Sequence, residues 1–300
     1  MFSYQKTVAN KVSCVGVGLH TGLNIELTLL PASEDSGIVF RRVDIKDKNN
    51  EVPAIYSNVS NTLLGTTLCN QDGVRVATIE HLMAALWGCG VDNCVIELNG
   101  PEIPIMDGSS EPFVFLLECA GVRELKSTRK VIEVLKEIKV YEDDSETSGY
   151  ISITPSNNFS VGLEIDFGDE VIAKQQGSFD SGDVSFKSDL CRARTFGFEH
   201  EVDMMREKGL AKGGSLENAI VVGKEGVLNK EGLRYSDEFV RHKILDCIGD
   251  VYLAGGHIKG HIRGFKSGHG LNNKLLRTFF GDKDAWRIVQ IQDSGTVAFS

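Results

Sequence analysis

The order of secondary-structure patterns most constrains the fold of this chain, because strand-like segments precede helix-like segments twice along it. In the first half, residues 12–40 alternate apolar and polar side chains, as in Ile25-Glu26-Leu27-Thr28-Leu29. Gly18–Gly22 is expected to be the turn between two strands, and Asp72-Gly73 the turn of a second hairpin. The first half is therefore predicted to begin with antiparallel strands.

Helical signals follow in the same half. The segment from Ile79 onward predicts a helix with Thr78 as its N-cap residue, ending at Gly88 or Gly90. After a strand at 93–98 and a loop rich in proline, a second helix is expected between Ser110 and Gly121. The charged segment Lys126–Lys130 lacks periodicity, so we place a domain boundary there.

The second half repeats this order. Strands are expected at 131–140, 151–153, 161–167, 219–222 and 257–265. Helices are expected at 199–208, at 237–254 with Ser236 as the cap, and near the C-terminus around Leu271, Leu275 and Leu276. The chain is therefore predicted to contain two similar α+β domains, residues 1–126 and 130–300, although no repeated sequence is visible.

Composition narrows the class of protein. The 300 residues are 41% apolar, enough for one or two cores, and the net charge of −10 argues against binding nucleic acid through a general positive field. No segment approaches the roughly 18 apolar residues needed to span a bilayer, and the N-terminus has no apolar signal-like region. The seven cysteines are scattered and odd in number, which favours reduced thiols. We expect a cytoplasmic protein.

The helix expected at 237–254 carries the most informative polar residues. Its geometry places His242, Asp246 and Asp250 on one side, with Lys243 beside them, opposite an apolar stripe. A histidine and a carboxylate one turn apart can bind one metal ion, and catalytic zinc usually has three protein ligands. The same spacing is common on solvated helix faces, so spacing alone leaves both interpretations open.

A third ligand would come from another histidine: His20, His81, His200, His257, His261 or His269. His81 has a physical argument in its favour, because a helix N-terminus disfavours the charged imidazolium and metals bind the neutral ring. Its neighbour Glu80 would then be placed to act as a general base. The pair is equally typical of a first-turn acid and a buried core histidine.

Two glycine-containing segments could also bind a ligand. His269 lies in the loop Lys266–Gly270, whose glycines allow close approach of a ligand, and Lys266 could meet a phosphate; both are also ordinary loop residues. Gly16–Gly22 has the wrong glycine spacing for a dinucleotide loop and leads into a strand, so it is interpreted as a hairpin. Neither a P-loop nor an HExxH motif is present.

Six blocks, in order along nearly the whole chain, resemble the UDP-3-O-acyl-N-acetylglucosamine deacetylase family, which removes acetate from the 2-amino group of its substrate in the committed step of lipid A synthesis. These blocks are residues 16–22, 78–82, 101–109, 192–198, 239–246 and 266–269.

The resemblance implies a zinc enzyme with a β-α-α-β sandwich and an active site between its two domains. It makes His81, His242 and Asp246 the ligands of one Zn²⁺, which Fe²⁺ can replace. Glu80 would take a proton from the attacking water. His269, oriented by Asp250, would stabilise developing charge. Either His269 would protonate the leaving amine, or Glu80 alone would carry the proton to it.

The resemblance also implies the contacts that stabilise and bind the substrate. The Thr195 hydroxyl would donate to the oxyanion, and Lys243 and Lys266 would meet the diphosphate and sugar. The side chains expected near the reacting group and along the passage for the fatty acyl chain are Phe196, Leu64, Phe198, Val202, Leu210 and Ala211. Core packing is the alternative role for each of these apolar residues.

The chain departs from the family on the nucleotide side. Residues 142–149 are acidic and lack a basic residue that some members carry, and the uridine contacts around 159–163 are not clearly matched. The small-molecule substrate is the expected partner, with no nucleic acid, no stable membrane insertion, room for transient inner-membrane contact, and a monomeric state. A nucleotide-sugar binding protein without catalysis, and a metal hydrolase acting on another amide, are the alternatives.

Overall fold

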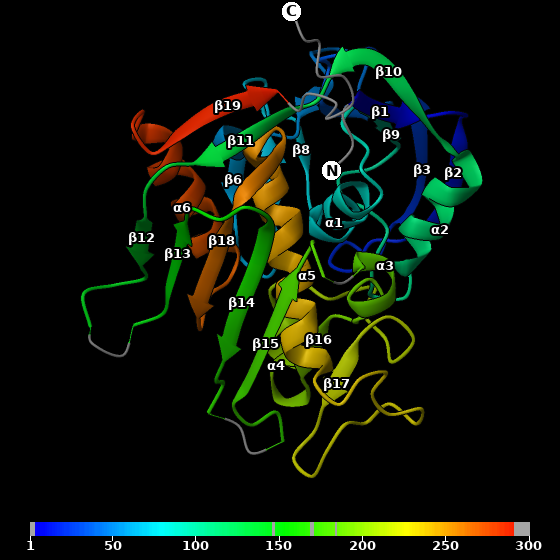
Figure 1. Ribbon diagram of the computed structural model, residues 1–300. Coiled ribbons are helices and arrows are strands. Elements are labelled where there is room, and N and C mark those ends of the chain that lie inside the picture. The colour runs from blue at the N-terminus through cyan, green and yellow to red at the C-terminus, as the bar shows by residue number, and fades with distance from the viewer. Residues whose placement is uncertain (1–3, 146–147, 169–170, 184, 291–300) are drawn as a thin grey trace, which may run out of the picture.

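Two helices lie side by side at the centre of the molecule, with strands on both sides of them (Figure 1). They are α1 (Glu80–Gly88) from the first half of the chain and α5 (Glu238–Val251) from the second half. The computed structural model describes residues 4–145, 148–168, 171–183 and 185–290. Within these ranges the protein is an α+β structure of sheets packed against a few helices, which confirms the predicted fold class.

The first half contains three sheets. One has five strands in the order β2-β3-β9-β4-β5, one is the meander β6-β7-β8, and β1 pairs antiparallel with β10. The elements are β1 (Tyr4–Val8), β2 (Val12–Val17), β3 (Asn24–Pro31), β4 (Ile38–Arg42), β5 (Glu51–Pro53), η1 (Tyr56–Asn58), β6 (Val59–Asn61), β7 (Thr67–Cys69), β8 (Arg75–Val76), α1, β9 (Cys94–Leu98), α2 (Glu111–Ala120) and β10 (Val122–Thr128).

The second half is built on a seven-stranded sheet centred on β18, which pairs with β13 antiparallel and with β11 and β14 parallel. The short strands β16 and β17 pair separately. The elements are β11 (Lys130–Val134), β12 (Ile138–Tyr141), β13 (Tyr150–Thr154), β14 (Phe159–Ile165), β15 (Gln175–Asp180), α3 (Phe186–Asp189), β16 (Phe196–Phe198), α4 (Glu199–Glu207), β17 (Ile220–Val222), α5, η2 (Tyr252–Ala254), β18 (His257–Phe265), α6 (His269–Gly281) and β19 (Trp286–Gln290).

The central position of α1 follows from its sequence. Leu82–Trp87 is apolar on every side, and a helix without a polar face is stable only when it is surrounded by other elements. All six residues are buried, in one hydrophobic cluster that extends through both halves of the chain. Among the described residues, no helix is long and apolar enough to cross a membrane.

Local signals predicted the turns well. The Gly18–Gly22 segment joins the antiparallel strands β2 and β3, and Asp72-Gly73 lies between β7 and β8. The second helix begins after Ser110 and ends before Gly121, and the strand predicted at 257–265 has the predicted bounds.

Other predicted positions were wrong. Thr78 does not cap α1, because its backbone has a φ of 57° and its hydroxyl donates to Glu102. Ser236 does not cap α5, which starts at Glu238 after Asp237. His269 is the first residue of α6 and not part of a loop.

The predicted strand at 131–140 is two strands, because β11 pairs with β18 and β19 whereas β12 pairs with β13. Much of the charged segment 126–130 also lies in strands, since β10 extends to Thr128 and β11 begins at Lys130. The division into domains at this segment stays a prediction.

At Gly249, the backbone of α5 lies close to the backbone of α1. A Cβ atom at this position would lie 2.0 Å from the backbone oxygen of Glu80, so only glycine fits.

We expect Gly249→Ala to force the helices apart, with a loss of about 3 kcal/mol in the free energy of unfolding and most of the activity. Chemical denaturation measures the first effect. Gly281→Ala is the control, because a Cβ atom added there would have nothing within 4 Å; equal stability of the two variants would contradict this account.

Candidate functional site

The polar face of α5 is covered by the first turn of α1. His242, Asp246 and Asp250 are only 2–4% exposed, although the opposite face of the same helix is also buried. The interpretation of these residues as a solvated face is therefore wrong. Burying two carboxylates and a histidine is costly unless they are paired or bind a metal ion.

Three of the buried side chains converge. His81 Nε2 lies 3.5 Å from Asp246 Oδ1, and His242 Nε2 lies 3.4 Å from the same oxygen. The nearest ligand atoms of His81, His242 and Asp246 all lie within 4.8 Å of one another. The three side chains come from two helices more than 150 positions apart, which Gly249 allows to pack closely.

This cluster fits a metal ion. Two ligand atoms that each lie about 2.0–2.1 Å from one tetrahedral ion are separated by about 3.3–3.4 Å, close to the two nitrogen–oxygen distances found. Asp246 Oδ1 is also fully buried, and no hydrogen-bond donor among the described residues satisfies it. A buried carboxylate oxygen between two imidazole nitrogens is what a divalent cation would satisfy.

The protonation of the cluster favours metal binding at His242. Its Nδ1 lies 3.0 Å from the carbonyl oxygen of Ala193, so this nitrogen donates its hydrogen and leaves the Nε2 lone pair for a metal. Burial lowers the pKa of His242 to about 4, so the ring is neutral at pH 7. Burial raises the pKa of the Asp246 carboxyl, but His242 and Lys243 hold it well below its usual range.

His81 behaves differently from the expectation based on its helix N-terminus. Burial lowers the pKa of His81, but the Asp246 carboxylate raises it by more, so the net shift is upward. The neighbouring carboxylates of Asp246 and Glu80 therefore favour the charged form of the His81 ring.

Glu80 lies beside the cluster, and its carboxylate is fixed from the other side by Thr66. The backbone N–H of Thr66 donates to Glu80 Oε2 at 2.9 Å. Burial raises the pKa of Glu80, although the positive charges of His269 and His81 oppose that shift. A buried carboxylate with a raised pKa can accept and return a proton near neutral pH.

A second polar chain links His269 to Asp250. His269 Nδ1 donates to Asp250 Oδ2 at 2.7 Å, the Asn272 amide donates to the same oxygen at 2.8 Å, and the Thr66 hydroxyl donates to Asp250 Oδ1. Burial lowers the pKa of His269, but the Asp250 carboxylate raises it to about 9. His269 is therefore a cation at neutral pH, with its Nε2 side free to donate.

A cavity of about 980 Å³ opens beside these groups. Its lining includes ten of the predicted site residues: His242, Lys243, Asp246, His269, Thr195, Phe196, Phe198, Val202, Leu64 and Ala211. Leu210 and Lys266 do not line it, and Lys266 Nζ lies 3.1 Å from Asp166 Oδ2. Lys243 Nζ lies 3.4 Å from Asp246 Oδ2, and both residues line the cavity.

Two residues that line this cavity have a strained backbone conformation. Seven described residues other than glycine have a positive φ: Asp35, Leu64, Thr78, Met106, Ala173, Ala211 and Lys266. Leu64 and Ala211 line the cavity, and Thr78 comes just before Glu80. Strained backbone of this kind collects at functional sites, because the surrounding structure has to hold it in place.

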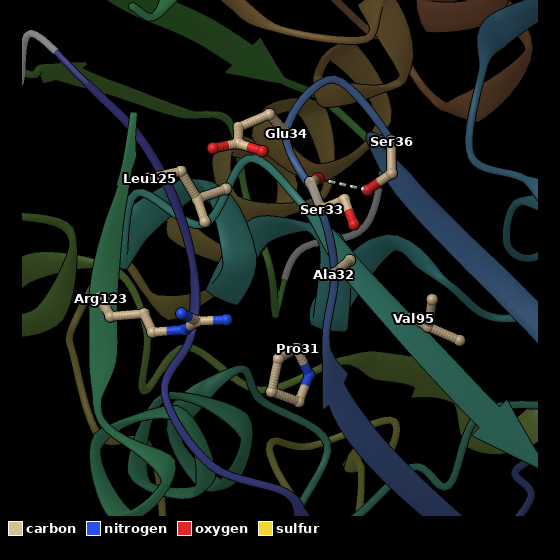
Figure 2. Close-up of a pocket in the computed structure, with 8 residues that line it drawn as sticks. All are labelled: Pro31, Ala32, Ser33, Glu34, Ser36, Val95, Arg123 and Leu125. Carbon is tan, nitrogen blue, oxygen red and sulfur yellow. Dashed lines mark hydrogen bonds between the residues drawn. The ribbon is translucent and has the colours of Figure 1, made fainter. Parts of the chain in front are cut away.

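A smaller hollow lies elsewhere, beside β3 and β10 (Figure 2). It measures about 540 Å³, and its only ionisable side chains are Glu34 and Arg123. None of the predicted site residues lines it. We therefore place the candidate site in the larger cavity.

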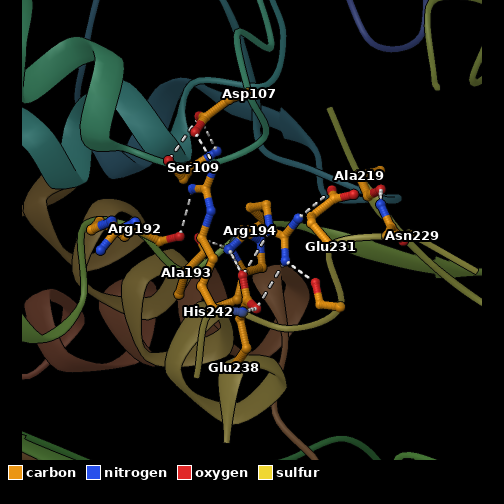
Figure 3. A network of polar contacts seen from close by, with 12 residues as sticks. Asp107, Ser109, Arg192, Ala193, Arg194, Ala219, Asn229, Glu231, Glu238 and His242 are labelled. Carbon is orange, nitrogen blue, oxygen red and sulfur yellow. Dashed lines mark hydrogen bonds and ion pairs between the residues drawn. The ribbon is translucent and has the colours of Figure 1, made fainter. Parts of the chain in front are cut away.

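Sequence reasoning missed a buried ion pair that supports two site residues (Figure 3). The backbone N–H and the Nε of Arg194 both donate to Glu238 Oε1, at 3.0 and 2.9 Å. This holds the chain on either side of Arg194, where the Ala193 carbonyl accepts from His242 and Thr195 faces the cavity. The resemblance included Arg194 but gave it no role.

The contacts of Thr66 and Asn272 with Asp250 were also missed, since no local sequence pattern distinguishes these two residues.

Glu238→Gln should therefore weaken metal binding. The substitution replaces one buried acceptor oxygen with an amide nitrogen, which faces N–H donors. It also removes the negative charge of the buried ion pair, so the Arg194 guanidinium loses its buried counterion. We expect a loss of about 10- to 100-fold in metal affinity, the range found when groups behind metal ligands are changed. Competition with a chromophoric chelator measures it.

Glu231→Gln is the matched control, because Glu231 pairs with the same guanidinium but its side chain is 60% exposed. Unchanged metal affinity in folded Glu238→Gln protein would contradict the role of the pair.

Comparison with known proteins identifies the family of the chain. Residues 5–281 match the family model described as UDP-3-O-acyl N-acetylglycosamine deacetylase. The chain is 48% identical over 298 residues to the UDP-3-O-acyl-N-acetylglucosamine deacetylase of Teredinibacter turnerae, and 49% identical over 298 residues to that of Saccharophagus degradans. Each alignment covers 99% of this chain and 96% of the relative. The chain therefore belongs to the UDP-3-O-acyl N-acetylglycosamine deacetylase family.

Proposed function

We propose that this protein hydrolyses the N-acetyl group of UDP-3-O-(3-hydroxyacyl)-N-acetylglucosamine, giving UDP-3-O-acyl-glucosamine and acetate, in the biosynthesis of lipid A. Family membership over residues 5–281 supports the reaction. The observation that carries the proposal is the buried cluster of His81, His242 and Asp246 with Glu80 and His269 beside it.

We propose that His81, His242 and Asp246 hold one Zn²⁺. Two imidazoles and one carboxylate with room for a further ligand form a donor set that catalytic zinc uses, and Fe²⁺ accepts the same donors. When bound, the ion polarises the amide carbonyl and lowers the pKa of water. The remaining steps fall to the side chains around it.

Glu80 is proposed as the general base. Its carboxylate, held by the Thr66 backbone N–H, accepts a proton from the water that attacks the acetamide carbon. Attack places negative charge on the carbonyl oxygen, and the Thr195 hydroxyl at the cavity wall is proposed to donate to it. Lys243, 3.4 Å from Asp246, adds positive charge at the same end of the cavity.

His269 is proposed as the general acid. Collapse of the tetrahedral intermediate breaks the carbon–nitrogen bond, and the amine leaves only when its nitrogen receives a proton. His269, kept protonated by Asp250, can supply that proton to the sugar nitrogen. The products are then acetate and the free amine. Because both a base and an acid flank the cluster, a binding protein without catalysis is the weaker alternative.

The shape of the cavity suits a sugar with a long acyl chain. Lys243, Asp246 and His269 line it beside the cluster, and the rest of the lining combines apolar side chains such as Phe198 and Val202 with charged ones such as Glu199 and Arg206. We propose that the acetamide reaches the cluster and the acyl chain lies along the apolar side chains.

Lys266 is proposed to bind the diphosphate after leaving Asp166. Its side chain is 37% exposed, and ion pairs this exposed contribute about 0–1 kcal/mol, so exchange for a phosphate is favourable. Leu210 stays a predicted contact of the acyl chain. The cytoplasmic location, the monomeric state and transient membrane contact also stay predictions.

Acetate release from UDP-3-O-(3-hydroxyacyl)-N-acetylglucosamine tests the proposal. Free amine and acetate should appear in equal amounts, and UDP-N-acetylglucosamine without the acyl chain should react at least about 100-fold more slowly, because it leaves the apolar part of the cavity empty. An enzyme that holds its metal but releases no acetate from the acylated substrate would overturn it.

The pairing of His269 with Asp250 predicts a shift in the pH profile. His269 acts protonated, so kcat should fall as the pH rises through its pKa, which Asp250 raises. Asp250→Asn removes the charge that raises this pKa, and the alkaline limb of kcat should move to lower pH by about one unit or more. Asn272→Ala is the control, because it removes a donor to Asp250 but keeps the carboxylate charge. An alkaline limb at the same pH in Asp250→Asn protein would contradict the pairing.

A further inference from the structure

Glu102 is a completely buried carboxylate that the proposed mechanism does not use. It is 0% exposed and lies in the loop between β9 and α2. Its Oε2 accepts from the backbone N–H of Thr21 at 2.9 Å and from the Thr21 hydroxyl at 2.7 Å. Its Oε1 accepts from the backbone N–H of His20 at 2.8 Å and from the Thr78 hydroxyl at 3.0 Å.

These donors place Glu102 between two parts of the site. His20 and Thr21 belong to the turn that joins β2 to β3, and Thr78 comes two residues before Glu80. Among the described residues, the hydrogen bonds to this carboxyl group come from two backbone N–H groups and two hydroxyl groups, all of them neutral. Such an arrangement is costly to bury and specifies one position of the turn relative to α1.

The turn forms part of the cavity wall. Leu19 and His20 both line the cavity of about 980 Å³. Beyond them, the His20 ring lies 3.3 Å from the carbonyl oxygen of Leu64, another lining residue. The turn therefore does more than join two strands, because two of its residues line the cavity.

The same turn holds the segment that follows α4. The N–H of Gly213 donates to the Leu19 carbonyl at 3.0 Å, and the N–H of Lys212 donates to the His20 carbonyl at 3.3 Å. A Cβ atom on Gly213 would lie 2.3 Å from the Gly18 oxygen, so the two backbones are in direct contact. Moving the turn would move this segment, which includes the lining residue Ala211.

We propose that Glu102 is a positioning residue for recognition of the acyl chain. It touches no substrate, but it fixes the Leu19-His20 wall and, through that wall, the 211–213 segment. The apolar part of the cavity then keeps the width that a long acyl chain needs. This inference rests on the proposed function, because it assigns the wall to the acylated substrate.

Thr21 offers a sharper test than Glu102, whose replacement would leave four donors without their acceptor. Thr21→Val keeps the shape of the side chain but removes the hydroxyl that donates to Glu102, and Thr21→Ser keeps that hydroxyl. Losing a hydrogen bond to a charged group corresponds to a change of about tenfold or more in an equilibrium constant.

The experiment compares substrates with a long and a four-carbon 3-O-acyl chain. In Thr21→Val, KM for the long-chain substrate should rise about tenfold, kcat should stay within about twofold, and both constants for the short-chain substrate should stay unchanged. Thr21→Ser should restore the wild-type KM. Equal losses for the two substrates, or an unchanged KM for the long chain, would overturn the proposal.

Hydrogen–deuterium exchange gives a readout without activity. The backbone N–H groups of residues 18–22 and 211–213 should exchange faster in Thr21→Val than in the wild type and in Thr21→Ser. Unchanged exchange in both segments would overturn the positioning role. If wild-type enzyme released no acetate from either substrate, the proposed function would fail, and faster exchange in Thr21→Val would still support the anchoring of the turn by Glu102.

Discussion

Glu80→Gln is expected to lower kcat by about 10²- to 10⁴-fold while the protein keeps its metal. The carboxylate is buried beside the cluster of His81, His242 and Asp246, but it is not one of the three converging ligands. Glutamine has nearly the same shape and can still accept from the Thr66 N–H, but it cannot take a proton from water. The large effect therefore falls on the chemical step.

Steady-state kinetics, metal analysis and thermal unfolding of the same sample distinguish loss of the base from loss of the metal and from loss of the folded structure. Glu118→Gln, at an exposed glutamate on α2, is the matched control and should match the wild type in all three. Turnover of Glu80→Gln within about threefold of wild type would remove Glu80 from the role of base.

Asp246→Ala and His81→Ala are expected to lose tightly bound metal and activity together. Each removes one of three converging ligands, and a change at a ligand should exceed the 10- to 100-fold loss of affinity typical of groups behind the ligands, so we expect a loss of more than about 100-fold. In Asp246→Ala, Lys243 and His81 also lose the carboxylate that lies 3.4–3.5 Å from them.

Metal content after dialysis and the rate of acetate release are the two measurements. Asp237→Ala is the control, because Asp237 comes directly before the same helix, its side chain is 37% exposed, and it pairs with Arg241 and not with a residue of the cluster. A His81→Ala protein that is fully active without metal would refute the ligand assignment.

Helical periodicity alone predicted that His242, Asp246 and Asp250 share one face of a helix, and the structure agrees. It could not tell a solvated face from a buried site, because that depends on α1, whose contact with α5 joins residues far apart in the sequence. The assignment of the third ligand came from the resemblance to the family. The distances between His81 and Asp246 came only from the fold.

Turns were predictable where their chemistry is local, as at Asp72-Gly73, which lies between two short antiparallel strands. Strands that depend on distant partners were not. The edge strand β19 was missed because its pairing with β11 joins residues about 155 positions apart, and β10 was missed because its charged sequence becomes a strand only against β1.

The hydrogen-bond network around Thr66 also could not be predicted from the sequence. Its backbone and hydroxyl join Glu80, Asp250 and His269, which lie 14, 184 and 203 positions away in the sequence. No spacing rule covers such distances, and a threonine beside a second threonine carries no local signal. The roles of Glu102 and Glu238 could not be predicted either, because their hydrogen-bond donors are distant in the sequence and are known only from the structure.

The central claim is that acetate release depends on a divalent ion held by His81, His242 and Asp246. The most direct measurement is the rate of acetate release from UDP-3-O-(3-hydroxyacyl)-N-acetylglucosamine before metal removal, after complete removal with a chelator, and after stoichiometric Zn²⁺ is returned. The account predicts that activity disappears with the metal and returns with Zn²⁺. An unchanged rate of acetate release from protein shown to contain no metal would contradict it.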